Sequence, residues 1–420
     1  MPFSLEVVLI IFALVALLGV IFEEVIHVNK AKTTLFFGSL SWLVMFMFSG
    51  GGEHQQEVIL EKLNENLLEI ATLWLFLMAT MTFVAYLNAK GIVQSVVQRM
   101  CPAQMSTRSL MVLVALFAMT LSMICDNVTA TLVTLGLVHA FNVDQKTRIK
   151  LAVLVVFAVN SGGVALITGD VTTLMIFLSG HVTMPQLLML WVPAIVGVMV
   201  LACLMFPCVS GQVTTEKDPR VFTGMDWAIV GTFFSTILCT MLFNFFFQVP
   251  PVLTFLVGLS IMFFIGQFMY MNPEETRILE YVRQIEYETL LFFLGILLLV
   301  GMLKEIGTLD LLTGFYTQIA PQYANYLMGA FSALIDNVPL TAALLKSEPT
   351  LPTAEWLGLT YSVGVGGSLL AIGSAAGIIA MSKVKGLTFG AFLRYTPFVF
   401  IAYTCGYLVA LGLASLLFPG

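Results

Sequence analysis

Long apolar runs separated by short polar segments make up most of this chain. The runs cover residues 5–22, 33–49, 67–88, 109–141, 149–180, 186–208, 226–248, 251–271, 287–303, 309–346, 355–382 and 395–418. Roughly 20 apolar residues can cross the hydrocarbon core as a helix, which satisfies its own backbone hydrogen bonds there. The pattern therefore predicts an all-α polytopic membrane protein.

Two of the runs, 109–141 and 309–346, are too long for a single crossing, and each carries an Asp-Asn pair near its middle. The pairs are Asp126-Asn127 and Asp336-Asn337. An ionised group halfway along an apolar segment favours a helix that turns back over one that faces lipid. We therefore predict a re-entrant helical hairpin in each run.

The basic residues indicate an orientation if both hairpins return to the side they entered and the other runs cross. All 18 Lys and Arg except Lys62, Lys304 and Lys346 then fall on one face. The positive-inside rule assigns that face to the cytoplasm. We predict a multi-pass protein of the cytoplasmic (inner) cell membrane, with its N-terminus and the acidic segment around residues 53–65 outside.

Related motifs recur in the two halves of the chain. SMICDNVTAT at 122–131 aligns with SALIDNVPLT at 332–341, an offset of 210 residues. Because the charge map places the two hairpins on opposite sides, the relation is an inverted repeat. The predicted units are residues 1–208 and 209–420.

Glycines and hydroxyl residues interrupt two further runs, 149–180 at NSGGVALITGDVTT and 355–382 at GGSLLAIGS. Their glycine pairs match at an offset of 204 residues, which supports the repeat. A helix broken at membrane depth frees backbone groups, and this is tolerated where they line a polar cavity. We expect two broken helices and two hairpin tips to form one site near the midplane.

Three carboxylates, Asp126, Asp170 and Asp336, are predicted at membrane depth, where each costs about 3 kcal/mol to insert. A hard cation such as Na⁺ offsets that cost by binding carboxylate, amide and hydroxyl oxygens. The predicted direct Na⁺ ligands are Asp126, Asn127, Asp170, Asp336 and Asn337. The remaining candidates for the sodium and proton site are Thr129, Asn160, Thr172, Thr173, Ser332, Thr341 and Ser374.

A proton neutralises the same carboxylates, so Na⁺ and H⁺ compete for one set of oxygens. Competition together with alternating access is sufficient for antiport. The structural alternative is that Asp126, Asp170 and Asp336 only cap the helices that follow them. The hydroxyls of Ser332 and Ser374 also have an alternative, since they can bond their own helix backbone.

Composition agrees with a membrane location. Hydrophobic residues make up 59% of the chain and charged residues 10%, against about 25% charged in an ordinary soluble domain. The lipid bilayer is the expected partner, and nucleic acid is not. The six cysteines form no C-x-x-C pair, so neither disulfides nor structural zinc is expected.

At CDNVTATL, SGGVxxxxGDVTT and ALIDNVPLTA the sequence resembles NhaD-type sodium/proton antiporters. They belong to the ion transporter superfamily, which also includes sodium/dicarboxylate symporters. The resemblance implies exchange of Na⁺ or Li⁺ for H⁺ in pH homeostasis, with no cofactor. It also implies a homodimer with scaffold and transport domains and elevator-like movement. The chain departs from many relatives at Ala85 and Asn88, where they have acidic residues.

Three rival functions remain. A Na⁺-coupled carboxylate or other anion transporter of the same superfamily would need its buried negative charges offset by bound cations. An intramembrane aspartyl protease would use a carboxylate dyad, but the repeated Asp-Asn tips have no purpose in one. A passive channel would not need titratable groups at two mirrored half-sites. We therefore expect a transporter and not an enzyme.

Overall fold

The computed structural model describes residues 3–21, 23–26, 28–48, 53–92, 95, 104–139, 141–214, 222–269 and 279–418. Four basic residues used for the predicted orientation lie outside these ranges: Arg99, Lys217, Arg220 and Arg277. The only strands in the described part are β1 (Gln104–Ser106) and β2 (Gln212–Thr214), which pair antiparallel. The chain is otherwise helical, as the hydropathy pattern predicts, although that pattern gave no sign of the small sheet.

The helices of the first half are α1 (Phe3–Ile21), α2 (Glu23–Ile26), α3 (Lys30–Phe48), α4 (Glu53–Ala89), α6 (Thr107–Ile124), α7 (Asn127–His139), α8 (Gln145–Gly163), α9 (Val171–Leu178), α10 (Met184–Leu188), α11 (Trp191–Met205) and the 3₁₀ turn η1 (Phe206–Cys208). Those of the second half are α12 (Gly224–Phe247), α13 (Pro251–Met269), α14 (Leu279–Arg283), α15 (Tyr287–Glu305), α16 (Asp310–Gln318), α17 (Pro321–Ser332), α18 (Asn337–Lys346), α19 (Thr353–Gly366), the 3₁₀ turn η2 (Gly367–Leu369), α20 (Ala375–Lys383), α21 (Phe389–Leu393) and α22 (Thr396–Leu417).

Eight helical stretches in the described ranges are long and apolar enough to cross a membrane. They are Lys30–Phe48, His54–Ala89, Thr107–Ile124, Met184–Cys208, Gly224–Phe247, Pro251–Phe268, Tyr287–Glu305 and Thr396–Leu417. The prediction of a polytopic membrane protein is therefore confirmed.

Both Asp-Asn pairs lie where one helix ends and the next begins. α6 ends at Ile124, and the carboxyl of Asp126 accepts a hydrogen bond from the backbone N–H of Thr129 at 2.9 Å. Asp336 caps α18 by accepting a hydrogen bond from the backbone N–H of Val338 at 3.3 Å. Such caps satisfy N–H groups that have no partner inside the helix. Both carboxylates therefore have a structural role, whatever else they bind.

The run 309–346 forms three helices, α16, α17 and α18, where we expected the two arms of a hairpin. Pro321 begins α17 at a position where its fixed φ suits a helix start. Its missing N–H also prevents α16 from continuing through it. The pair of helices around Asp336 is therefore α17 and α18 alone.

Two predicted helix breaks are present in the structure. α8 ends at Gly163, and α9 begins after Asp170. α19 ends at Gly366 and continues into η2, after which Ser374 precedes α20. Each break therefore carries a capping side chain, Asp170 or Ser374, at the start of its second helix.

Glycines bring each broken helix against the helix that precedes its Asp-Asn pair. A Cβ atom on Gly162 in α8 would lie 2.0 Å from the carbonyl oxygen of Met119 in α6. A Cβ atom on Gly366 in α19 would lie 1.9 Å from the carbonyl oxygen of Gly329 in α17. Only glycine permits these two approaches, which occur at corresponding places in the two halves.

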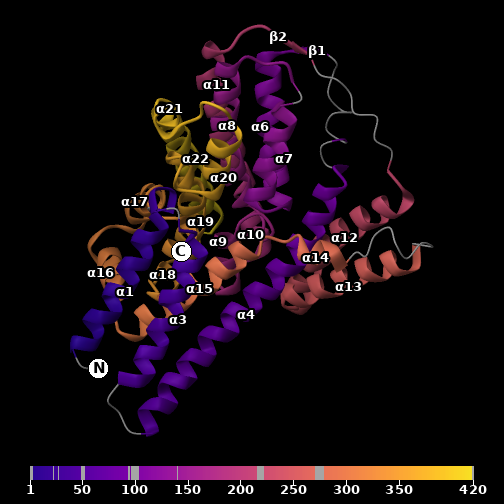
Figure 1. The fold of residues 1–420 in the computed structure, drawn as a ribbon. Helices are drawn as coiled ribbons and strands as arrows, with labels where there is room; N and C mark the ends of the chain where they lie inside the picture. Colours follow the sequence, from indigo (N-terminus) through magenta and orange to yellow (C-terminus); the bar gives the residue numbers. More distant parts are fainter. Residues whose placement is uncertain are drawn as a thin grey trace.

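A second close packing joins α3 to α15. A Cβ atom on Gly38 would lie 2.5 Å from the carbonyl oxygen of Gly295, and the indole N–H of Trp42 donates to the carbonyl of Leu298 at 2.9 Å. α4 packs against α13 and α15. In Figure 1 α3 and the start of α4 lie at the opposite end of the molecule from α6, α8 and α11.

α4 begins far earlier than the apolar run at 67–88 predicts. The acidic segment expected in an outer loop instead forms the first turns of this helix, which starts at Glu53. Lys62 and Glu65 form an ion pair at 3.1 Å, three residues apart on its surface. Hydropathy marks the lipid-facing part of a helix and not its polar extension, so the start was missed.

Candidate functional site

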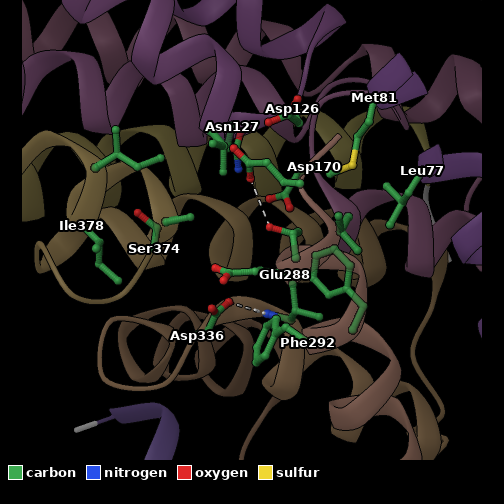
Figure 2. Close-up of a pocket in the computed structure, with 18 of the residues that line it drawn as sticks. Leu77, Met81, Asp126, Asn127, Asp170, Glu288, Phe292, Asp336, Ser374 and Ile378 are labelled. Atoms are coloured by element: carbon green, nitrogen blue, oxygen red, sulfur yellow. Dashed lines mark hydrogen bonds between the residues drawn. The ribbon is translucent and has the colours of Figure 1, made fainter. Parts of the chain in front are cut away.

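A cavity of about 750 Å³ lies between the helix pairs and the α3–α15 contact. The predicted site residues that line it are Asp126, Asn127, Asp170, Asp336, Asn337 and Ser374. Figure 2 shows the carboxylates of Asp126, Asp170 and Asp336 around this space, with Ser374 at its left. The structure thus brings together the three carboxylates expected at membrane depth.

Asp170 lies close to one residue of each Asp-Asn pair, Asn337 and Asn127. The side-chain amide of Asn337 donates to its Oδ2 at 3.3 Å, and the backbone N–H of Thr172 donates to its Oδ1 at 3.2 Å. A Cβ atom on Gly163 would lie 2.8 Å from Asn127 Oδ1 and 3.1 Å from Asp170 Cβ. Because Gly163 has no side chain, the side chains of Asn127 and Asp170 can both pack against it.

Asn160 and Ser374 join the two broken helices. The buried Asn160 amide donates to Ser374 Oγ at 3.0 Å and to the carbonyl of Val156 at 3.1 Å. Ser374 Oγ also accepts a hydrogen bond from the backbone N–H of Gly377 at 3.4 Å. A contact between residues 214 positions apart thereby connects the two halves of the chain.

Three side-chain oxygens of predicted site residues are buried without a hydrogen-bond partner: Asn160 Oδ1, Thr172 Oγ1 and Thr173 Oγ1. A buried polar atom left unpaired costs about 1–3 kcal/mol. A Cβ atom on Gly364 would lie 3.4 Å from Asp170 Oδ2 and 3.8 Å from Thr172 Oγ1, so both oxygens lie next to the same point of α19. Unpaired hard oxygens beside a carboxylate suit a small cation.

Six predicted residues do not line the cavity: the buried Asn160, Thr172 and Thr173, and also Thr129, Ser332 and Thr341. Ser332 Oγ donates to the carbonyl of Val363 at 3.0 Å, and Thr341 Oγ1 donates to the carbonyl of Asn337 at 2.8 Å. Thr129 is placed by its backbone bond to Asp126. Ser332 therefore joins α17 to α19, whereas Thr341 bonds the backbone of its own helix.

Sequence reasoning missed the charged residues at the mouth of the cavity. Lys30 Nζ lies 2.8 Å from Asp336 Oδ2, and the Asn29 amide donates to Glu288 Oε2 at 2.7 Å. From the sequence, Lys30 is only one of the basic residues that indicate the orientation in the membrane. Its place at the start of an apolar run, next to the motif EEVIHVNKA, was the available signal.

Glu286 stands immediately before α15 and faces the same cavity. Burial away from water is the main cause that raises the pKa of Glu286 to about 7, and the negative charge of Asp126 is the second. A hydrogen bond from Thr289 Oγ1 at 3.2 Å opposes that increase. Glu286 therefore changes its charge near neutral pH.

Negative charge dominates the cavity lining. Its basic residues are Lys30 and Lys383. Its acidic residues are Glu23, Asp126, Asp170, Glu286, Glu288 and Asp336. A cavity of this sign favours cations over anions.

Comparison with known proteins matches residues 7–357 to the citrate transporter family. The chain is 31% identical over 406 residues to the Na(+)/H(+) antiporter NhaD of Vibrio parahaemolyticus, covering 89% of this chain and 98% of that protein. The chain belongs to the NhaD family. The chain is also 31% identical to the Na(+)/H(+) antiporter NhaD of Vibrio cholerae, over 94% of this chain and 89% of that protein.

A plant protein is also similar to this chain. Sodium/proton antiporter 1 of Arabidopsis thaliana is 29% identical, over 95% of this chain and 71% of the plant protein. The resemblance read from the Asp-Asn motifs is therefore confirmed. The NhaD relatives named here are transporters and not enzymes, as those motifs predict.

Proposed function

We propose that this NhaD protein exchanges Na⁺ or Li⁺ for H⁺ across the cell membrane at the cavity described above. The observation that carries the proposal is the convergence of Asp126, Asp170 and Asp336 in one negatively charged cavity. The NhaD relatives from both Vibrio species are named as Na⁺/H⁺ antiporters, which supports the same exchange. The transported ions are the substrates, and the proposal needs no cofactor.

The site binds either ion through the same carboxylates. Na⁺ takes up carboxylate oxygens together with amide and hydroxyl oxygens, and Asn127 Oδ1 and Thr172 Oγ1 lie near Asp170. A proton neutralises a carboxylate and removes its attraction for Na⁺. Each ion therefore displaces the other, which is the property that exchange requires.

Alternating access in this proposal uses two inverted repeats, residues 1–208 and 209–420. The pairs α6–α7 and α17–α18 are re-entrant hairpins, and α8–α9 and α19–α20 are the broken helices. The matching motifs and the matching glycine contacts at Gly162 and Gly366 support this arrangement. The hairpins and broken helices form the transport domain, and α3, α4, α13 and α15 belong to the scaffold.

The orientation in the membrane is part of the proposal. The cavity is lined by Lys30 and Lys383, which belong to the basic face predicted in the cytoplasm. In this orientation the cavity opens towards the cytoplasm, which is the inward-open state, and the N-terminus lies outside. A homodimer with elevator-like movement, serving pH homeostasis, follows from the family resemblance alone.

Citrate transport is the second candidate, because the matching family bears that description. Citrate is a polyvalent anion at neutral pH, and the cavity holds six acidic residues and two lysines. Like charges at such a site repel the ligand unless bound cations offset them. The charge balance therefore favours a cation as the transported species.

Everted membrane vesicles test the proposal directly. Respiration acidifies the vesicle interior, and a pH-sensitive dye reports the gradient. Addition of Na⁺ or Li⁺ is expected to dissipate the gradient in vesicles that contain this protein and not in vesicles without it. Asp126→Asn, Asp170→Asn and Asp336→Asn are each expected to abolish the response. No response to either ion, from neutral to alkaline pH and with correctly inserted protein, would overturn the proposal.

A further inference from the structure

The ammonium group of Lys30 forms an ion pair with the carboxylate of Asp336 in the cavity. Lys30 Nζ and Asp336 Oδ2 lie 2.8 Å apart, and their side chains are 20% and 13% exposed. Figure 2 shows this contact as a dashed line from Asp336. One of the three carboxylates proposed to bind Na⁺ is thus already paired with a cation that belongs to the protein.

The position of Lys30 is fixed from two sides. Its backbone N–H donates to Glu23 Oε1 at 3.0 Å, at the start of α3. Its ammonium also lies 4.5 Å from the centre of the Phe292 ring, within the range of a cation–π contact. A lysine at a membrane boundary ordinarily extends its ammonium to water. Lys30 instead directs its ammonium onto a carboxylate in the site.

Stability alone does not explain this ion pair. Removing two charges from water carries a desolvation penalty that can exceed their mutual attraction, so a buried pair is weak evidence for stabilisation. Asp336 already has a structural partner in the backbone N–H of Val338. Asp126, the equivalent residue of the first half, has no ion-pair partner within the part of the chain that the structure describes.

The pair also connects two parts of the fold. Lys30 begins α3, which packs tightly on α15 through Gly38 and Gly295. Asp336 is the N-cap of α18, whose first residue, Asn337, donates to Asp170. A change at this contact therefore affects the α3–α15 unit and the carboxylate cluster together.

We propose that Lys30 is a tethered competitor of Na⁺, which neutralises Asp336 while the site is empty and must leave it when Na⁺ binds. This inference rests on the proposed function. Asp336 carries one negative charge, so it cannot neutralise the ammonium and a bound Na⁺ at once. The competition weakens Na⁺ binding and favours its release. Lys30 is in this sense a positioning residue that sets the apparent affinity.

Exchange kinetics of Lys30→Gln test the competition at one fixed alkaline pH. The variant is expected to lower the KM for Na⁺ about tenfold, as expected when one close charge pair is lost. Lys30→Arg keeps the charge and is expected to keep a KM near that of the wild type. A purely structural role predicts a lower maximal rate without a lower KM, so an unchanged or higher KM in Lys30→Gln would overturn the inference.

Lys383→Gln is the matched control, because it removes a positive charge from the same cavity without touching Asp336. A KM changed less than twofold in this variant assigns the effect to the Lys30 contact. An equal decrease in both variants would show a general change in cavity charge and would overturn the inference. Absence of exchange in the wild type would instead refute the proposed function. Failure of the Lys30 inference and failure of the proposed function are therefore distinguishable.

Acylation of the wild-type protein gives a second test that does not depend on folding of a variant. A small amine-reactive reagent is applied to the purified protein in Na⁺ or in choline, and modified lysines are quantified by mass spectrometry. Na⁺ is expected to increase modification of Lys30 several-fold and to leave Lys383 unchanged. Equal modification of Lys30 in both salts would contradict its displacement.

Discussion

Asp170 and Ser374 occupy equivalent positions in the two halves, and only Asp170 carries a charge. Each is the N-cap of the second part of a broken helix. A hydroxyl caps a helix about as well as a carboxylate does. The need for a cap therefore does not explain the acidic residue in the first half, whereas the proposed ion binding would.

Asp170→Ser separates capping from ion binding. The variant keeps an oxygen that can cap α9, so folding and membrane insertion are expected to persist while exchange in everted vesicles is abolished. Asp144→Ser is the matched control. Asp144 caps α8 by accepting from the backbone N–H of Thr147 at 3.3 Å and does not line the cavity. Full exchange in Asp170→Ser would return Asp170 to a purely structural role.

Glu286 gives the cavity a charge that depends on pH. Its pKa is raised to about 7, so the carboxyl is neutral below that pH and ionised above it. The ionised form adds a negative charge that attracts Na⁺. Glu286→Gln is therefore expected to raise the KM for Na⁺ a few-fold at a pH above 7 and to have little effect below it.

Steady-state exchange at two pH values, one on each side of that pKa, measures the effect. Glu280→Gln is the control, because Glu280 is exposed on α14 outside the cavity. A KM for Glu286→Gln equal to that of the wild type at the higher pH would refute a role for Glu286 in attracting Na⁺.

The residues of the site differ in how well sequence predicts them. Asp126, Asp170 and Asp336 were predictable because a carboxylate inside an apolar run is costly unless it binds something. Lys30 was not, because a lysine at the end of such a run ordinarily lies at the interface. Its contact with Asp336 spans 306 residues of sequence, and local pattern carries no information about that pairing.

At the scale of helices, hydropathy predicted most spans because lipid requires long apolar helices. It failed where water or protein replaces lipid. The polar start of α4 carries too many charges to register as a span, and Pro321 divides α16 from α17 inside one apolar run. The close glycine contacts of the broken helices depend on which helices meet, and hydropathy does not determine that.

These glycine contacts lead to a prediction about α8 and α19. Gly162→Ala and Gly366→Ala would each place a methyl group within about 2 Å of a backbone oxygen, and such overpacking costs about 1–3 kcal/mol. Both variants are expected to lower the thermal unfolding temperature in detergent and to reduce exchange. Gly231→Ala in α12 is the control, because a Cβ atom there has no neighbour within 4 Å. Wild-type stability in both test variants would refute the tight contacts.

At the scale of the whole molecule, the proposed orientation places the negatively charged cavity on the cytoplasmic side of the membrane. Ser382 and Lys383, near the end of α20, line the cavity, whereas His54 lies near the exposed start of α4. The positive-inside rule places α20's end in the cytoplasm and the start of α4 outside. An inward-open antiporter would then receive Na⁺ from the cytoplasm through a negatively charged mouth.

Thiol labelling of single-cysteine variants measures this orientation. In a background with all six native cysteines replaced, Ser382→Cys and His54→Cys each place one thiol at an exposed position. A membrane-impermeant maleimide is expected to label His54→Cys in intact cells and Ser382→Cys only in everted vesicles. Labelling with the opposite sidedness would reverse the orientation, and labelling of both thiols from one side would contradict the topology on which the inverted repeat depends. The same Ser382→Cys thiol reports access to the cavity, since a shift to the outward-open state would slow its labelling in everted vesicles without affecting His54→Cys.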